Sequence, residues 1–203
     1  MTLILDFGSG NTCQNDFHIV KRMLGCMRKV DSKKYPIVVK WQLFRAAHPN
    51  APLLPQVFQA AYYAARDMGY ACTASVFDEQ SCEFLLKYQV PFVKIATGCP
   101  DPVKLIDMVP RRIPIVRSFA PRLASWGWNQ YNLQCVAEYP ADPAKYDHTR
   151  VGFDGISDHT VGWDMFKKAP WYNYWEKHYR LPESTGLDAG PFACTAEELK
   201  EIM

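Results

Sequence analysis

The sequence predicts an α/β protein, a compact (β/α)8 TIM barrel with several shortened or missing helices. Short β-rich runs recur eight times along the chain, and helical patterns or loops separate them. Strands that alternate with helices pair in parallel through right-handed crossovers, and eight of them close into a barrel. The chain has 203 residues, whereas such barrels typically have about 250 and seldom fewer than about 200. We therefore expect one domain over residues 1–203 with a reduced helical layer.

The predicted elements follow from residue type and spacing. The eight strands cover residues 3–8, 37–43, 70–76, 92–97, 113–119, 132–138, 151–159 and 172–181. Apolar residues at helical spacing predict a first helix from Phe17 to Met27, and Pro55 opens a second. Asp78 is the expected N-cap of a third helix over residues 81–88, and residues 102–109 predict a shorter fourth. The later connections, residues 121–131 and 140–150, are too short or too proline-rich for full helices.

A doubly wound open sheet is the alternative fold. Such a sheet binds its ligand at a topological switch point, usually through a glycine-rich first turn. Residues 7–11, Phe-Gly-Ser-Gly-Asn, resemble that turn but lack its third glycine. The barrel is therefore the favoured prediction.

Composition excludes several classes of function. A formal net charge of +2 gives no electrostatic argument for binding nucleic acid or an anionic membrane. No apolar run is long enough to cross a bilayer, and the N-terminus lacks the pattern of a signal peptide. The seven cysteines are scattered, odd in number and never spaced as C-x-x-C, which indicates reduced thiols. We expect a cytoplasmic protein.

Polar side chains stand where the predicted strands end. In barrels of this type the active site is built at the C-terminal strand ends. Where two such residues belong to one strand they are mostly two apart, so that they share a face. The candidates are Asp6, Lys40, Gln42, Lys94, Thr97, Ser118, Tyr139, Ser157, His159, Glu176 and His178.

Two of these residues are lysines within apolar strands. Burying Lys40 and Lys94 there is unfavourable unless anionic groups compensate them. With Ser118 and Ser157 they would form a cradle for a phosphate or a carboxylate. The alternative is that each lysine reaches solvent or pairs with Asp6 or Glu176. Two lysines at equivalent strand positions, opposite two histidines, favour the cradle.

Two short motifs carry those histidines. They are residues 157–160, Ser-Asp-His-Thr, and residues 176–179, Glu-Lys-His-Tyr. His159 and His178 lie on consecutive predicted strands, each with an oxygen group two residues earlier on the same face. Two imidazoles with oxygen donors suit a divalent metal with open positions. A lone histidine on an apolar strand is more often a satisfied core residue. Cys135 is interpreted as core rather than as a nucleophile, since no base stands beside it in sequence.

Several motifs in order resemble the sialic acid synthase family, which includes N-acetylneuraminate synthase and relatives that make legionaminic or pseudaminic acids. Residues 39–42 (VKWQ) are similar to V-K-F-Q, 77–81 (FDEQS) to F-D-E-E-S and 90–98 (VPFVKIATG) to V-P-x-x-K-I-A-S-G. Residues 135–141 (CVAEYPA) are similar to C-V-S-E-Y-P-A, and the two histidine motifs match S-D-H-T and E-K-H-F. The resemblance spans almost the whole chain.

The resemblance implies a metal-dependent condensation of phosphoenolpyruvate with an N-acetylmannosamine-like aldose, giving a nonulosonic acid and phosphate. His159 and His178 would hold the ion, by expectation Mn²⁺, with Mg²⁺ or Co²⁺ as alternatives. Lys40, Lys94, Thr97, Ser118 and Ser157 would bind phosphoenolpyruvate, and Gln42, Tyr139, Glu176 and Asp188 would contact the sugar or position water. Asp6, Glu176 and Lys94 are the expected catalytic residues.

The sequence also departs from the family pattern. Asp6 stands where the family has a glutamate, and Gly186-Leu187-Asp188-Ala189 replaces G-P-D-H. The segment after the second strand is reduced to residues 45–55, and residues 118–121 (SFAP) replace S-T-G-M. The family continues into an antifreeze-like domain that supplies a sugar-binding arginine to a partner subunit. This sequence lacks that domain, so we expect a homodimer of another kind or a separate partner.

Two functions therefore stay open. The first is a pared-down synthase that keeps the metal and phosphoenolpyruvate half of the site. The second is a non-catalytic phosphoenolpyruvate- or sugar-binding homologue that has lost turnover, for which Asp6 and the absent domain are the evidence. A third, weaker option is another metal-dependent aldol-type barrel enzyme with a phosphorylated substrate.

Overall fold

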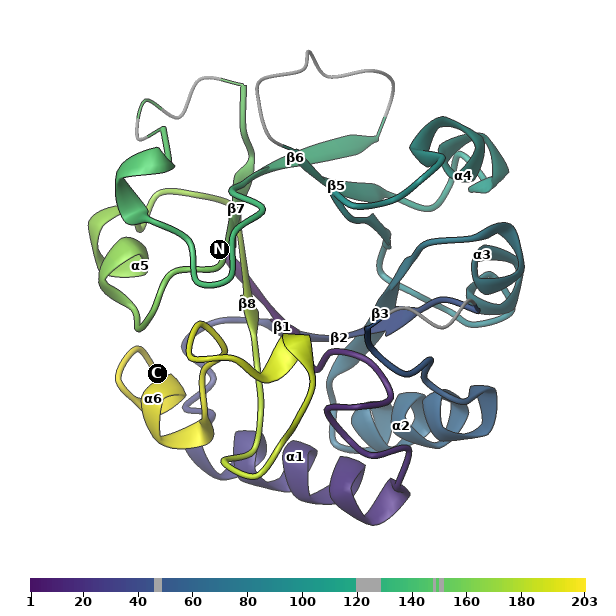
Figure 1. Ribbon diagram of the computed structural model, residues 1–203, viewed down its shortest axis with the longest axis horizontal. Helices are drawn as coiled ribbons and strands as arrows, with labels where there is room; N and C mark the ends of the chain where they lie inside the picture. The colour runs from purple at the N-terminus through teal and green to yellow at the C-terminus, as the bar shows by residue number, and fades with distance from the viewer. Residues whose placement is uncertain (46–48, 120–128, 148, 150–151) are drawn as a thin grey trace.

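Eight parallel strands form a closed barrel in the computed structural model, which describes residues 1–45, 49–119, 129–147, 149 and 152–203 (Figure 1). The strands follow the chain in order around the barrel. They are β1 (Thr2–Asp6), β2 (Ile37–Leu43), β3 (Ala71–Val76), β4 (Val93–Ile95), β5 (Ile115–Phe119), β6 (Gln130–Cys135), β7 (Gly155–Asp158) and β8 (Tyr174–His178). The predicted barrel is thus confirmed. The open-sheet alternative is wrong, because β1 pairs with β8 as well as with β2.

The helices cover the barrel unevenly. The elements are α1 (Phe17–Val30), α2 (Pro55–Asp67), α3 (Glu79–Leu85), α4 (Pro102–Met108), α5 (Asp164–Lys168) and α6 (Ala196–Lys200), with 3-10 turns η1 (Pro143–Lys145) and η2 (Leu187–Ala189). Figure 1 shows α1 to α4 following β1 to β4 around one side. Between β6 and β7 the described residues form only η1. The fold is therefore a TIM-like barrel with missing helices.

Local signals explain where the predicted helices begin. Asp78 caps α3, because its side chain accepts a hydrogen bond from the Ser81 amide, and Asp101 caps α4 through the Lys104 amide. Both donors are orphan amides of a first helical turn. The third helix begins and ends earlier than predicted, at 79 and 85. The five-residue helices α5 and α6 were not predicted, since each is too short to show a helical repeat.

The apolar core has two layers that the strands separate. The outer layer lies between the barrel and its helices, and buried Trp163 and Trp175 both contact Phe166 of α5 within it. The inner layer is a small cluster that consists of Ile4, Val38, Phe92, Val116 and Leu133. Each of these five residues stands two positions before a polar residue on the same face: Asp6, Lys40, Lys94, Ser118 and Cys135. The apolar cluster therefore fills the bottom of the barrel interior, and the polar groups lie above it at the C-terminal end.

Strand register sets polar residues of neighbouring strands side by side. Asp6 stands level with Lys40 of β2 and with His178 of β8. Ser157 of β7 stands level with Glu176 of β8. Side chains that are level on neighbouring strands and share the inner face lie next to each other.

The cysteines and the helices bear on the class of protein. All seven cysteines are free of disulfides, as their spacing indicated. Within the described residues, no helix is long and apolar enough to cross a membrane.

Gly155 tests the tight packing at the barrel floor. A Cβ at this position would fall on the Tyr174 carbonyl oxygen and lie 2.7 Å from Leu133 Cδ2. We expect Gly155→Ala to lower the free energy of unfolding by about 1–3 kcal/mol, the usual effect of overpacking. Urea denaturation measures this. Gly25→Ala in α1, where a Cβ meets nothing within 4 Å, should raise stability by about 0.5–1 kcal/mol. Equal effects of the two substitutions would contradict the packing account.

Candidate active site

One cavity of about 1110 Å³ opens at the C-terminal end of the barrel. It is lined by all twelve residues singled out from the sequence: Asp6, Lys40, Gln42, Lys94, Thr97, Ser118, Tyr139, Ser157, His159, Glu176, His178 and Asp188. Eleven of these come from seven of the eight strands or from the loop residues that follow them, and Asp188 comes from η2. Tyr139 and Thr97 lie beyond the ends of β6 and β4, both of which end earlier than predicted. The structure thus brings the candidates together in one cavity.

Two buried lysines and two buried carboxylates form the centre of the cavity. Lys40 Nζ lies 2.6 Å from Asp6 Oδ2 and 3.5 Å from Glu176 Oε1. Lys94 Nζ lies 3.1 Å from Glu176 Oε2. All four side chains are at most 5% exposed. The sequence left two interpretations of these lysines open, an anion cradle or pairing with carboxylates. In the structure both lysines pair with carboxylates and both line the cavity.

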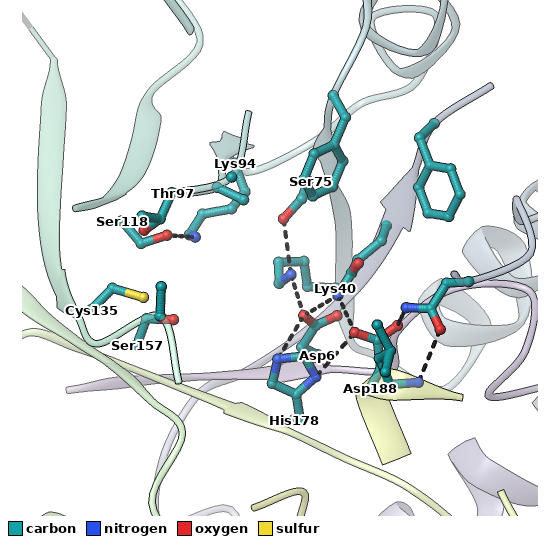
Figure 2. A pocket seen from close by; sticks show the side chains of 18 of the residues that line it. Asp6, Lys40, Ser75, Lys94, Thr97, Ser118, Cys135, Ser157, His178 and Asp188 are labelled. Atoms are coloured by element: carbon teal, nitrogen blue, oxygen red, sulfur yellow. Dashed lines mark hydrogen bonds and ion pairs between the residues drawn. The ribbon is translucent and has the colours of Figure 1, made fainter. Parts of the chain in front are cut away.

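Each lysine also donates to a serine on the neighbouring strand. Lys40 donates to Ser75 Oγ at 2.9 Å, and Lys94 donates to Ser118 Oγ at 2.8 Å. Figure 2 shows Ser118, Thr97 and Ser157 facing the Lys94 side, while Asp6, His178 and Asp188 gather on the other side. One half of the cavity therefore presents ammonium and hydroxyl groups, and the other presents carboxylates and imidazoles.

The surroundings of the two lysines shift their pKa values in opposite directions. Burial lowers the pKa of both, but Asp6 and Glu176 outweigh burial at Lys40 and raise its pKa. At Lys94 burial outweighs Glu176, and the neighbouring Lys40 charge adds to it, so the pKa is lowered. Burial would raise the pKa of Glu176, yet the two ammonium groups hold it below its usual value. The centre is therefore an ionised network that stabilises the charged form of Lys40 more than that of Lys94.

His159 and His178 meet at the same end of the barrel. Their ring centroids are 5.4 Å apart. The Nδ1 atom of His159 lies 2.8 Å from the Val136 carbonyl oxygen, so Nδ1 carries the donated proton and Nε2 is left as a lone-pair donor. The peptide amide of His159 donates to the Tyr146 hydroxyl at 3.1 Å. Both the ring and the backbone of His159 are thus held in place.

His178 lies between two carboxylates. Its Nε2 is 3.7 Å from Asp6 Oδ2, and its Nδ1 is 3.7 Å from Asp188 Oδ1. Burial lowers the pKa of His178 even though both carboxylates oppose the shift. Among the described side chains, buried His178 Nδ1 has no hydrogen-bond partner. A neutral, buried imidazole with an unused nitrogen is the form that binds a metal ion.

The donor atoms are of the types that bind a divalent ion, but they do not form a complete metal site. Two imidazoles face a cavity that also holds carboxylate oxygens, which suits a metal that keeps open positions. In the described part of the chain, however, no group of three His, Cys, Asp or Glu side chains is arranged to hold a metal. Further ligands would have to come from substrate or solvent.

Asp188 is anchored more firmly than the sequence suggested. Its carboxylate accepts hydrogen bonds from Gln42 at 3.0 Å, Asn50 at 2.9 Å and Ser9 at 3.2 Å. Burial raises its pKa. These contacts tie η2 to the loops after β1 and β2, so that the segment following β8 forms one wall of the cavity.

Aromatic rings form the wall near the histidines. The Tyr139 ring lies 4.3 Å from the His159 ring, and the Phe192 ring lies 5.1 Å from the His178 ring. Tyr139 is 57% exposed and lines the cavity. Phe44 and Phe77 pack edge to face and line the cavity as well.

Sequence reasoning missed several residues of the cavity. Ser75 is the inward residue at the end of β3, and strand alternation could have found it. Cys135, interpreted as core, lines the cavity with Sγ 4.0 Å from His159 Nδ1. Burial would raise the pKa of this thiol, but His159 lowers it. Asn50 and Phe192 come from loops, where no spacing or strand pattern marks a residue as functional. Ala120 and Pro121 of the altered 118–121 segment, and residues 46–48 of the 45–55 segment, lie outside the described residues.

Comparisons with known proteins agree with the predicted resemblance at the level of the fold. No protein-family model matches the chain, and no curated protein matches its sequence. Among solved structures, N-acetylneuraminic acid (sialic acid) synthetase from Leptospira borgpetersenii, in complex with citrate, superimposes with a TM-score of 0.78 at 16% identity, covering 98% of this chain and 80% of that chain. Spore coat polysaccharide biosynthesis protein SpsE from Bacillus subtilis gives a TM-score of 0.75 at 17% identity, with 99% of this chain and 65% of that chain covered.

A third structure is more distant. Phospho-2-dehydro-3-deoxyheptonate aldolase (DAHP synthase) from Thermotoga maritima gives a TM-score of 0.68 at 10% identity, with 99% of this chain and 66% of that chain covered. At such identities the likeness establishes the fold alone. It is the fold on which the sequence motifs were expected to lie.

The opposite pKa shifts of the two lysines predict unequal effects of removing them. A raised lysine pKa means that the folded state favours the charge, and this stability is lost only as pH rises through the folded pKa. Lys40→Met leaves Asp6 buried without its ammonium, so we expect a loss of about 3–5 kcal/mol in the free energy of unfolding at pH 7. Lys94→Met should cost clearly less, because folding already disfavours that charge. Urea denaturation at pH 7 compares the variants, and a larger loss for Lys94→Met would contradict the network described.

Proposed function

We propose that the chain catalyses a metal-dependent condensation of phosphoenolpyruvate with an N-acetylmannosamine-like aldose, giving a nonulosonic acid and phosphate. The observation that carries the proposal is the division of the cavity into two halves. Lys94 and three hydroxyl groups occupy one half, and the two imidazoles with Asp188 and Gln42 occupy the other. Lys40 stands between the halves, paired with Asp6 and bonded to Ser75. An anionic reactant and a polyhydroxylated reactant would each find the groups that suit them.

The cation half suits phosphoenolpyruvate. Its phosphate and carboxylate need charge-assisted hydrogen bonds in a water-poor site, which buried ammonium groups and hydroxyls supply. Without ligand, Asp6 and Glu176 neutralise both lysines. An incoming anion would take over part of these contacts. The arrangement keeps the ammonium groups ionised and oriented before substrate arrives, which is the condition for electrostatic preorganisation.

The imidazole half suits the aldose. A divalent ion held by His159 and His178, manganese by expectation, would polarise the aldehyde as a Lewis acid. Gln42, Asp188 and Tyr139 would contact the hydroxyl groups of the sugar, and Phe192 would pack on its less polar face. Holding both reactants in one pocket removes most of the entropic barrier to their meeting.

The remaining chemistry falls to residues at the centre. The enol carbon of phosphoenolpyruvate forms the new bond to the aldehyde carbon as the aldehyde π bond opens to an alkoxide. Water adds to the oxocarbenium-like carbon and its proton passes to that alkoxide, and the C–O bond to phosphate breaks so that phosphate leaves with its bridging oxygen. Lys94 and Lys40 would balance the charge that grows on the departing phosphate. Glu176 is held ionised between them and would accept a hydrogen bond from the attacking water. Asp6 would hold Lys40 and face His178.

Metal binding is the first test. Protein incubated with Mn²⁺ and then desalted should retain manganese, measured by elemental analysis, and His178→Ala should lose it. His18→Ala, on an exposed face of α1, is the matched control and should retain the metal. Native protein that retains no divalent metal would contradict the proposed chemistry.

Turnover is the second test. Phosphate release is measured with phosphoenolpyruvate, Mn²⁺ and a panel of N-acylated aminosugars, and we expect release that depends on both the sugar and the metal. Lys94→Met and His178→Ala should lower the rate by at least about 100-fold, since each effect supplies several kcal/mol. Lys87→Met, an exposed lysine, should leave the rate unchanged.

A calorimetric titration separates the two classes of function. Phosphoenolpyruvate that binds to the native chain but releases no phosphate with any sugar would point to the non-catalytic binding homologue. A native chain that binds neither phosphoenolpyruvate nor any sugar of the panel would refute both.

A further inference from the structure

Asp158 and Lys177 are the middle residues of the two histidine motifs, and the site described above uses neither. Strand alternation turns Ser157, His159, Glu176 and His178 into the cavity, so these middle residues project from the opposite face of the barrel wall. Both are fully buried there, at 0% and 1% exposure.

The two side chains form an ion pair between β7 and β8. Lys177 Nζ lies 2.9 Å from Asp158 Oδ2, and the two residues stand level in the strand register. Lys177 also donates to the Thr160 carbonyl oxygen, and its ammonium lies 5.6 Å from the centre of the Trp163 ring. The pair therefore bridges the ends of both strands immediately beside the histidines.

Asp158 fixes the turn that follows β7. Its Oδ1 accepts hydrogen bonds from the Thr160 amide at 2.8 Å and from the Thr160 hydroxyl at 2.7 Å. Lys177 holds the carbonyl of the same threonine. His159 lies between Asp158 and Thr160 in the chain. One ion pair thus holds the backbone on both sides of His159.

Stability alone is a weak reason for such a pair. Desolvating two charges offsets most of their attraction, and apolar residues of similar volume are often as stable or more stable. Compared with apolar residues, a pair of opposite charges favours one register of the two strands and one geometry of their side chains. Here that geometry places two imidazole rings 5.4 Å apart.

We propose that the Asp158–Lys177 ion pair is a positioning device that holds His159 and His178 at the spacing needed to share a divalent ion. The inference rests on the proposed function. It assigns a role to the second residue pair of the two motifs. Neither residue touches substrate or metal, and both act through the backbone of the histidines they adjoin.

Cobalt binding tests the proposal. Metal-free protein is titrated with Co²⁺, whose visible absorption reports coordination, and thermal unfolding and phosphoenolpyruvate binding are measured on the same samples. Lys177→Met should weaken cobalt binding by about tenfold or more, in the range seen for residues that support metal ligands. Phosphoenolpyruvate binding should be unchanged, because Lys40 and Lys94 keep their partners.

A second variant and a matched control keep the test decisive if Lys177→Met fails to fold. Asp158→Asn retains acceptors for Thr160 but removes the charge, and should weaken cobalt binding less. Arg117→Met removes another buried cation, 4% exposed and bonded to Asn132 across β5 and β6. It should lower the unfolding temperature but leave cobalt affinity intact. An equal loss of cobalt affinity in Arg117→Met would overturn the proposal, because the effect would then be a general loosening of the barrel.

An NMR readout without metal distinguishes failure of this inference from failure of the proposed function. Long-range ¹H–¹⁵N spectra of the histidine rings should show shifted His159 and His178 signals in Lys177→Met and native signals in Arg117→Met. Native protein that binds no cobalt would refute the proposed function, while the ring spectra would still decide the positioning role. A folded Lys177→Met variant with native ring signals and native cobalt affinity would refute the positioning role.

Discussion

Two lysine ammonium groups are buried inside a closed barrel, and the arrangement of the cavity follows from their need for compensation. Lys40 and Lys94 are each 1% exposed, and an isolated charge cannot be kept in such surroundings. Asp6 and Glu176 lie within 2.6–3.5 Å of them and make the network neutral. The closed barrel makes this possible, because it brings side chains of β1, β2, β4 and β8 together around one axis.

The same network prepares the site for an anion. Ammonium groups already ionised and aimed into a cavity need no rearrangement of water when a phosphate or a carboxylate arrives. The carboxylates that balance them border the imidazole half, where Asp6 lies 3.7 Å from His178. One set of charges thus links the two halves of the cavity through Asp6 and Glu176.

Both faces of the barrel wall carry polar side chains that bear on the site. Inward residues of β7 and β8 form the cavity, and the outward Asp158–Lys177 pair joins the same two strands from behind. On this side of the barrel the helical layer is thin, with only η1 and the five-residue α5 among the described elements between β6 and β8. Buried Trp163 and Trp175, packed on Phe166, supply much of the apolar cover there.

The sequence alone determined the barrel, its strand order and eleven of the polar residues that line the cavity, while Asp188 was expected only from the family resemblance. Period-two alternation within strands and the recurrence of strand and helix are local properties, so they can be read from the residues themselves. The short helices α5 and α6, and the exact strand ends, could not be read, since a single turn leaves no repeat.

Only the tertiary structure decided which groups compensate each other. That Glu176 serves both lysines, that Asp188 is held by Ser9 and Asn50, and that Cys135 faces His159 all depend on distances between strands and loops far apart in the chain. The partners of Asp158 and Lys177 likewise appear only when β7 and β8 are side by side. Such pairings are set by barrel closure and strand register, which no local pattern of residues encodes.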